Sequence, residues 1–204
     1  MKAFNISNSY KMLSGIERKY FKYSYSTFVQ PALTSDGRLG GDGFAIEGSD
    51  YWSGNPPWQA FDQSASYTAW VPYARYNDTN PEYVIMYNLK PLNVTSITVK
   101  NGSSNDTAWV SGDIQYSNDG VTWTNGISWT NSNQTGGVTW TIDLSSNTNY
   151  YNYYKINISE WKHRSTYARS VEEITLTATE RSIVSGTASD YDFYLDLDTY
   201  KAVA

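Results

Sequence analysis

The stretch IQYSNDGVTW, residues 114–123, decides the fold. Apolar and polar residues alternate from Ile114 to Tyr116, which is typical of a strand with one buried face. The sequence Asn-Asp-Gly at residues 118–120 then interrupts the alternation, and it supplies the positive φ angle that a tight turn requires. The stretch therefore predicts a β-hairpin between Tyr116 and Trp123.

Short apolar or alternating runs continue on both sides of this hairpin, from Pro31 to about Glu180. Clusters of Gly, Asn, Asp, Pro and Ser separate the runs, and stretches with helical periodicity are nearly absent. This pattern is typical of an all-β sandwich or barrel. The runs that we expect to form strands are residues 83–89, 96–99, 113–116, 138–144, 153–158 and 173–178.

The two ends of the chain differ from this region. Residues 1–29 are rich in Lys, Arg, Tyr and Phe, and we expect an arm that packs on its own domain or attaches to a neighbouring subunit. Residues 181–204 contain four aspartates, but their spacing lacks the glycine and terminal glutamate of an EF-hand loop, so a tail strand or subunit contact is expected. The predicted organisation is an N-terminal arm at 1–29, a β-sandwich at 30–180 and a C-terminal extension at 181–204.

The composition of the 204 residues excludes several classes of function. A net charge of -5 disfavours contact with phosphate backbones, so nucleic acid is not an expected partner. The absence of cysteine excludes disulfides and Cys-ligated zinc. No window approaches the roughly 20 apolar residues of a membrane span, and the first thirty residues lack the apolar stretch of a secretory signal.

Catalysis is also not expected. The chain has a single histidine and no cysteine, so a nucleophile with an adjacent base is difficult to assemble. Glu172 and Glu173 are neighbours on a predicted strand and should point to opposite faces, which rules them out as a facing carboxylate pair. We therefore expect a binding protein.

Several ordered landmarks resemble the discoidin family, also called coagulation factor V/VIII type C domains. Residues 58–62 (WQAFD) and 68–70 (TAW) resemble its A-F-D-G and T-x-W signatures, and 114–123 resembles its V-x-Y-S-x-D-G-x-x-W hairpin. Residues 83–89 and 94–99 resemble its paired strands around a DLG turn, and residues 153–158 and 171–176 resemble its closing strands. The resemblance implies a discoidin-type jelly-roll β-sandwich with a galactose-binding-like fold, flanked here by N- and C-terminal extensions.

The resemblance also implies a structural calcium ion. Relatives often hold one with backbone carbonyls, an Asp, a Thr and a Glu near the last strand, which by position are Asp62, Thr68 and Glu173 in this chain. These are hard oxygen donors of the kind that calcium prefers. The chain departs from the family because Gln63 replaces the usual glycine and the loop is one residue longer.

Loops at one end of such a sandwich are candidates for carbohydrate binding. Aromatic rings stack on sugars and polar groups bind the hydroxyls, and 16% of this chain is aromatic. The candidate glycan-binding residues are Tyr51, Trp52, Tyr73, Arg75, Trp109, His163 and Arg164. Each has an alternative: Trp109 and Trp161 can be packing residues, His163 a solvated polar residue, and Arg75 can stack on tyrosines of its own loop.

The resemblance does not fix galactose as the sugar. Galactose-binding relatives often carry an arginine shortly after the strand that ends at Val99, whereas this chain has Lys100 and Asn101 there. The sugar preference stays open.

Residues 31–37 (PALTSDG) and 40–45 (GGDGFA) further resemble discoidin-type modules in bacteriophage tail or fibre proteins. This implies a non-catalytic virion protein, a fibre, tail or capsid-decoration subunit that forms homo-oligomers, contacts other virion proteins and binds cell-surface glycans. It would be made in the host cytoplasm and lie on the particle surface. The alternatives are a purely structural assembly protein and a carbohydrate-binding module of a bacterial surface protein.

Overall fold

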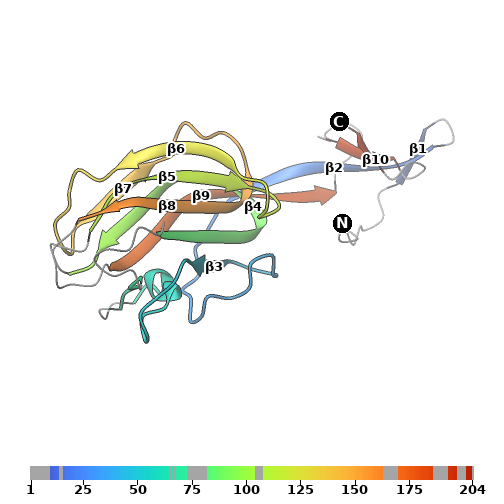
Figure 1. The fold of residues 1–204 in the computed structure, drawn as a ribbon. Coiled ribbons are helices and arrows are strands. Elements are labelled where there is room, and N and C mark those ends of the chain that lie inside the picture. The colour runs from blue at the N-terminus through green and yellow to red at the C-terminus, as the bar shows by residue number, and fades with distance from the viewer. Residues whose placement is uncertain are drawn as a thin grey trace. The chain divides into compact units, whose positions relative to one another are not determined.

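The computed structural model describes residues 10–13, 16–64, 66, 68–72, 82–103, 108–162, 170–185, 193–196 and 201–203 (Figure 1). Within these ranges it is almost entirely β-structure, as the sequence predicted. The strands are β1 (Tyr10–Leu13), β2 (Ile16–Thr27), β3 (Ala45–Gly48), β4 (Glu82–Asn101), β5 (Trp109–Ser117), β6 (Thr124–Thr130), β7 (Thr139–Asp143), β8 (Tyr151–Trp161), β9 (Val171–Ser185), β10 (Phe193–Asp196) and β11 (Lys201–Val203). A 3-10 helix, η1, spans Pro57–Phe61. No helix in the described ranges has the length and apolarity that a membrane crossing requires.

The chain divides into two compact units. The sandwich unit is Thr27–Glu180, and the terminal unit combines Met1–Ser26 with Arg181–Ala204. The sequence suggested two separate extensions, whereas the structure joins them in one unit.

The long strand β4 builds both layers of the sandwich unit. Its first half, residues 82–87, pairs with β3 and β8, and its second half, residues 92–101, pairs with β7 and β9. Strand β8 continues to β5, and β5 to β6. One layer is therefore β3–β4–β8–β5–β6 and the other is β7–β4–β9, which Figure 1 shows as stacked ribbons.

The predicted hairpin is confirmed. Strands β5 and β6 pair antiparallel, with Tyr116 opposite Thr124. Gly120 in the connection has a φ of 72°, and a Cβ atom at this position would lie 3.0 Å from the ring of Tyr153. Glycine is therefore required both by the turn and by the packing.

The core between the layers is rich in tryptophan. Trp109 is fully buried, and the ring centroids of Trp70, Trp129, Trp140 and Trp161 lie 5.9–6.4 Å from its own. The rings meet tilted or edge to face, which is the arrangement that aromatic quadrupoles favour. Trp109 begins β5 and Trp161 ends β8, so the cluster packs where these two paired strands meet at one end of the sandwich.

The terminal unit pairs a basic segment with an acidic one. Residues 1–26 carry five basic residues and one acidic residue, whereas residues 181–204 carry two basic and four acidic residues. In the register of β2 with β10, Arg18 lies opposite Asp196. A basic segment and an acidic segment attract each other, which gives a physical reason for the two ends of the chain to associate.

Candidate ligand-binding site

The loops that the sequence selected leave the sandwich at the same end. Gly48 at the end of β3 pairs with Val84 near the start of β4, and Glu82 pairs with Ile158 near the end of β8. Trp109 pairs with Trp161, and Asn101 pairs with Val171. These ends of β3, β4, β5, β8 and β9 therefore lie at one end of the sandwich, which we call the loop end.

Tyr51 and Trp52 are prominent at the loop end. Their side chains are 48% and 49% exposed, although both are large and aromatic. The backbone beneath them is held in place, because the Trp52 N–H donates to the Val71 carbonyl at 2.7 Å and the Asn55 N–H donates to the Trp52 carbonyl at 2.9 Å. The indole N–H of buried Trp70 also donates to the Asp50 carbonyl at 2.9 Å. Two adjacent, half-exposed aromatic side chains thus lie on a backbone that hydrogen bonds hold in place.

The other glycan candidates have different outcomes. Trp109 is 0% exposed and lies at the centre of the tryptophan cluster, so the packing alternative is correct and it offers no ring to a ligand. Trp161 is 3% exposed and belongs to the same cluster. Tyr73, Arg75, His163 and Arg164 lie outside the described residues.

Besides the segments that follow β3, precede β4, precede β5 and follow β8, the loop end has a fifth loop, residues 131–138, in which the sequence predicted no candidate residue. Asn101 is 1% exposed, and its side-chain amide donates to the carbonyls of Asn133 and Thr135 while accepting from the indole N–H of Trp140. Asn131, also 1% exposed, donates to the Trp109 carbonyl. The signal that could have revealed this loop is its polar run NSNQTGG between two predicted strands.

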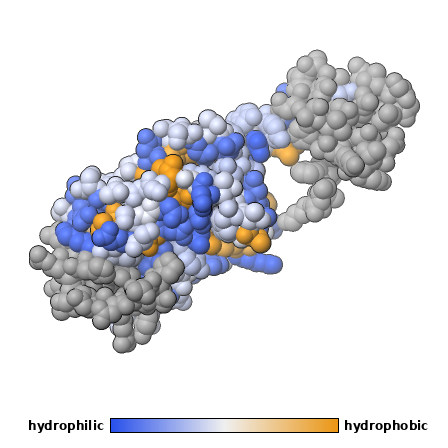
Figure 2. Space-filling model, turned by 45° about the horizontal axis from the view of Figure 1, so that its top comes forward, coloured by the Kyte–Doolittle hydropathy of each residue, from blue (hydrophilic) through white to orange (hydrophobic). Residues whose placement is uncertain are grey.

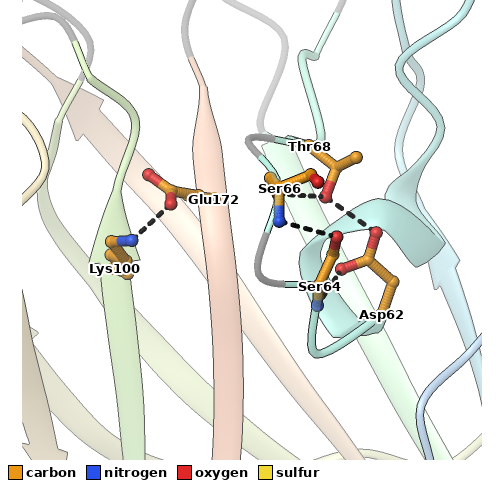
Figure 3. Close-up of polar contacts among 6 residues, drawn as sticks. All are labelled: Asp62, Ser64, Ser66, Thr68, Lys100 and Glu172. Carbon is orange, nitrogen blue, oxygen red and sulfur yellow. Dashed lines mark hydrogen bonds and ion pairs between the residues drawn. The ribbon is translucent and has the colours of Figure 1, made fainter.

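The side chains of Lys100 and Asn101 both contact other residues of the chain. Lys100 forms an ion pair with Glu172, drawn in Figure 3, and Asn101 is the buried anchor of the fifth loop. The adjacent Glu172 and Glu173 have different partners, since Glu172 pairs with Lys100 and Glu173 accepts from the Gln63 backbone.

The expected calcium loop is closed by its own side chains. The Thr68 hydroxyl donates to Asp62 Oδ2 at 2.7 Å, and the Ser64 N–H donates to Asp62 Oδ1 at 2.8 Å (Figure 3). Gln63 has a φ of 52°, in the left-handed region that glycine adopts most easily. Its side-chain amide donates to the Gln30 carbonyl at 2.7 Å, a contact that glycine could not make.

The carboxyl group of Glu173 lies near this loop, and few contacts stabilise its negative charge. Burial, together with the negative charge of Asp62, raises its pKa to about 7. Among the described residues, its buried Oε1 atom has no hydrogen-bond partner. An unpaired carboxylate oxygen beside a second carboxylate suits a divalent cation. The described residues hold no group of three or more acidic, His or Cys side chains, so other ligands would have to be hydroxyl or carbonyl oxygens.

Comparison of the sequence with protein-family models and with curated proteins gave no match. Solved structures do match. The family 32 carbohydrate-binding module of NanJ from Clostridium perfringens, solved with galactose, is 16% identical, with a TM-score of 0.53 over 68% of this chain and 93% of its own. An F5/8 type C domain from Bacteroides fragilis is 13% identical, with a TM-score of 0.55 over 71% and 93% of the two chains. The chain has a discoidin-type fold.

A third match with this fold is CBM32-3 from a family 31 glycoside hydrolase of Clostridium perfringens, which is 15% identical with a TM-score of 0.54 over 65% of this chain and 90% of its own. The discoidin-type fold thus confirms the architecture that the ordered landmarks implied. At these identities the fold is what the proteins share, and the ligand depends on the residues at the loop end.

Proposed function

We propose that the protein binds carbohydrate at the loop end of its sandwich. The observation that carries this proposal is the pair Tyr51 and Trp52, which are adjacent, about half exposed and fixed on a hydrogen-bonded loop. Rigid aromatic rings stack on the apolar face of a sugar with little loss of conformational entropy. Two solved structures with this fold contain galactose and GalNAc-β-1,3-galactose, which supports a carbohydrate ligand for this fold.

The fifth loop supplies polar groups suited to sugar hydroxyls. Asn133 and Thr135 are exposed, and the buried amides of Asn101 and Asn131 hold their backbone in place. Asn101 pairs with Val171, which in turn pairs with Trp70 beneath the aromatic loop, so both loops are tied to the same end of the second layer.

Substitution of the aromatic pair tests the site. In titrations with the strongest ligand from a glycan array, Trp52→Ala and Tyr51→Ala should each weaken binding by about tenfold or more, since stacked rings are often dominant contacts. Val121→Ala is the matched control, because Val121 is 80% exposed on the hairpin at the other end of β5. Unchanged affinity in both aromatic variants would contradict a carbohydrate-binding site at Tyr51 and Trp52.

We further propose that Asp62, Thr68 and Glu173 hold a structural calcium ion. The ion would neutralise the two carboxylates and brace the loop that precedes Trp70 at the loop end. Calcium should therefore raise the melting temperature of the wild-type protein, and Glu173→Gln should abolish that increase. Glu172→Gln is the control, because the neighbouring carboxyl group pairs with Lys100. A calcium response that persists in Glu173→Gln would contradict the assignment.

A second role, assembly into a larger particle, is favoured by the terminal unit. Both ends of the chain contribute strands to it, and a sugar-binding sandwich does not need it. We propose that the protein is a structural subunit on the surface of a bacteriophage particle and that it associates with copies of itself and with other virion proteins. The intact chain should then form a defined oligomer by light scattering, in calcium and in chelator alike.

A further inference from the structure

Four indoles of the tryptophan cluster fall into two pairs. The N–H groups of Trp70 and Trp140 donate hydrogen bonds at 2.9 and 2.8 Å, and both acceptors lie at the loop end. The N–H groups of Trp109 and Trp129 are buried and have no hydrogen-bond partner among the described residues. A phenylalanine ring would fill a core position without burying an N–H group, so the hydrogen bonds of the first pair indicate a use beyond packing.

Trp70 connects the core to the aromatic loop, which carries Tyr51 and Trp52. Its ring is fully buried, and the indole N–H donates to the Asp50 carbonyl, directly before Tyr51. The backbone of Trp70 is fixed as well, because its N–H donates to the Val171 carbonyl at 2.9 Å and its carbonyl accepts from the Val171 N–H at 3.0 Å. The indole therefore holds the aromatic loop from a position that the core fixes.

The aromatic loop also begins in close contact with this indole. A Cβ atom at Gly48, the last residue of β3, would lie 2.5 Å from Cγ of Pro57 and 3.2 Å from Cζ2 of Trp70. A side chain at this position would displace the backbone, so glycine is what lets the end of β3 lie against the indole. Packing and a hydrogen bond thus place the start of the aromatic loop on Trp70.

Trp140 has the corresponding contact with the anchor of the fifth loop. A side-chain amide accepts through its oxygen and donates through its nitrogen. Because the Trp140 N–H donates to Asn101 Oδ1, the Nδ2 atom of Asn101 is directed to the carbonyls of Asn133 and Thr135. The indole of Trp140 therefore fixes the orientation of the amide that holds the fifth loop.

We propose that the indole N–H groups of Trp70 and Trp140 position the aromatic loop and the fifth loop, respectively, for carbohydrate binding. This inference deepens the carbohydrate function proposed above and rests on it. On the face of the sandwich that Figure 2 shows, hydrophobic surface forms small spots among hydrophilic residues, so that face offers a ligand no broad apolar surface. Binding at the loop end then depends on a few side chains, and loops that are already held in place avoid the entropic cost of ordering them.

Three Trp→Phe variants of the intact chain test the proposal by amide hydrogen exchange and by glycan titration. Trp70→Phe should accelerate exchange of the Trp52 amide by about fivefold or more and weaken glycan binding by a similar factor, because one hydrogen bond of the loop is lost. Trp140→Phe should accelerate exchange in residues 131–138 and leave the Trp52 amide unchanged. Trp129→Phe is the matched control, because it makes the same truncation in the same cluster without the loss of a hydrogen bond. It should lower the melting temperature and leave the Trp52 exchange and the glycan affinity unchanged.

A substitution at Gly48 provides a second test if Trp70→Phe fails to fold. Gly48→Ala should displace the aromatic loop from the indole and accelerate exchange of the Trp52 amide, whereas Gly43→Ala should not, because a Cβ atom at Gly43 meets nothing within 4 Å. Unchanged Trp52 exchange in Trp70→Phe or in Gly48→Ala, or an equal acceleration in Trp129→Phe, would overturn the positioning role. A wild-type protein that binds no glycan would overturn the carbohydrate function, whereas the exchange rates, measured without ligand, would still decide whether the indoles hold the loops.

Discussion

Asp119 shows how one side chain can hold a turn. Its Oδ1 atom accepts from the backbone N–H groups of Val121 and Thr122 at 2.8 and 2.7 Å and from the hydroxyl of Ser117 at 2.9 Å. These bonds favour the ionised carboxylate and lower the pKa of Asp119 from 3.8 to about 2. The side chain of Asp119 therefore stabilises the turn directly, in addition to its position before Gly120.

The lowered pKa predicts a pH dependence of stability. The contribution of Asp119 is fully present above pH 3.8, its unfolded pKa, and is lost as the pH falls towards 2, its folded pKa. Asp119→Ala should melt at a lower temperature than wild type at pH 6, and the difference should shrink between pH 4 and pH 2. Because the other acidic groups titrate in both proteins, a difference that stays constant across this range would contradict the assignment.

Trp109 shows where residue-level prediction from the sequence fails. Counting alternate positions back from inward-facing Ile114 places Gly112 inward and Trp109 outward. The register of β5 with β8 shifts between Trp109 and Gly112, and this irregularity turns Trp109 into the core. Gly112 lies at this shift, where a Cβ atom would collide with the Asn157 carbonyl, but a glycine within a strand does not show which way the preceding side chains turn. Tyr51 and Trp52, in contrast, are exposed in a loop whose polar neighbours could be seen in the sequence.

At the scale of elements, most predicted strands coincide with observed ones. The hairpin was predictable because its turn chemistry is local. Strand β4 was expected as two strands, 83–89 and 96–99, yet it is one element that exchanges its partners at the bend between Tyr87 and Leu92. Such an exchange depends on long-range pairing, so the polar and proline-containing segment NLKPLN looks like a loop in the sequence.

The fifth loop depends on a single buried anchor. Asn101→Ala would leave the indole N–H of Trp140 and the carbonyls of Asn133 and Thr135 without their partner. Loss of these buried bonds should lower the free energy of unfolding by about 2–3 kcal/mol and increase amide exchange in residues 131–138. Asn149→Ala is the control, because Asn149 is exposed and these hydrogen bonds run through its backbone: its N–H donates to Asn147 and its carbonyl accepts from Asn93. Equal stability of the two variants in denaturant titrations would contradict the anchoring role.

At the scale of the whole molecule, the two compact units of the chain contribute different features. The sandwich unit supplies the stable layers, the tryptophan cluster and the loop end, and the terminal unit supplies strands from both ends of the chain. The sandwich was predictable because its landmarks are local and ordered. The association of the two ends was not, because the partners are separated by the entire sandwich and only their opposite charges hinted at the pairing.

The measurement that tests the central claim most directly is a glycan array probed with the intact chain beside Trp52→Ala. We predict that the wild-type protein binds a restricted group of related oligosaccharides and that the variant loses this binding while keeping the wild-type melting temperature. No binding by the wild-type protein at high concentration, or an identical pattern in the variant, would contradict a carbohydrate site at the loop end.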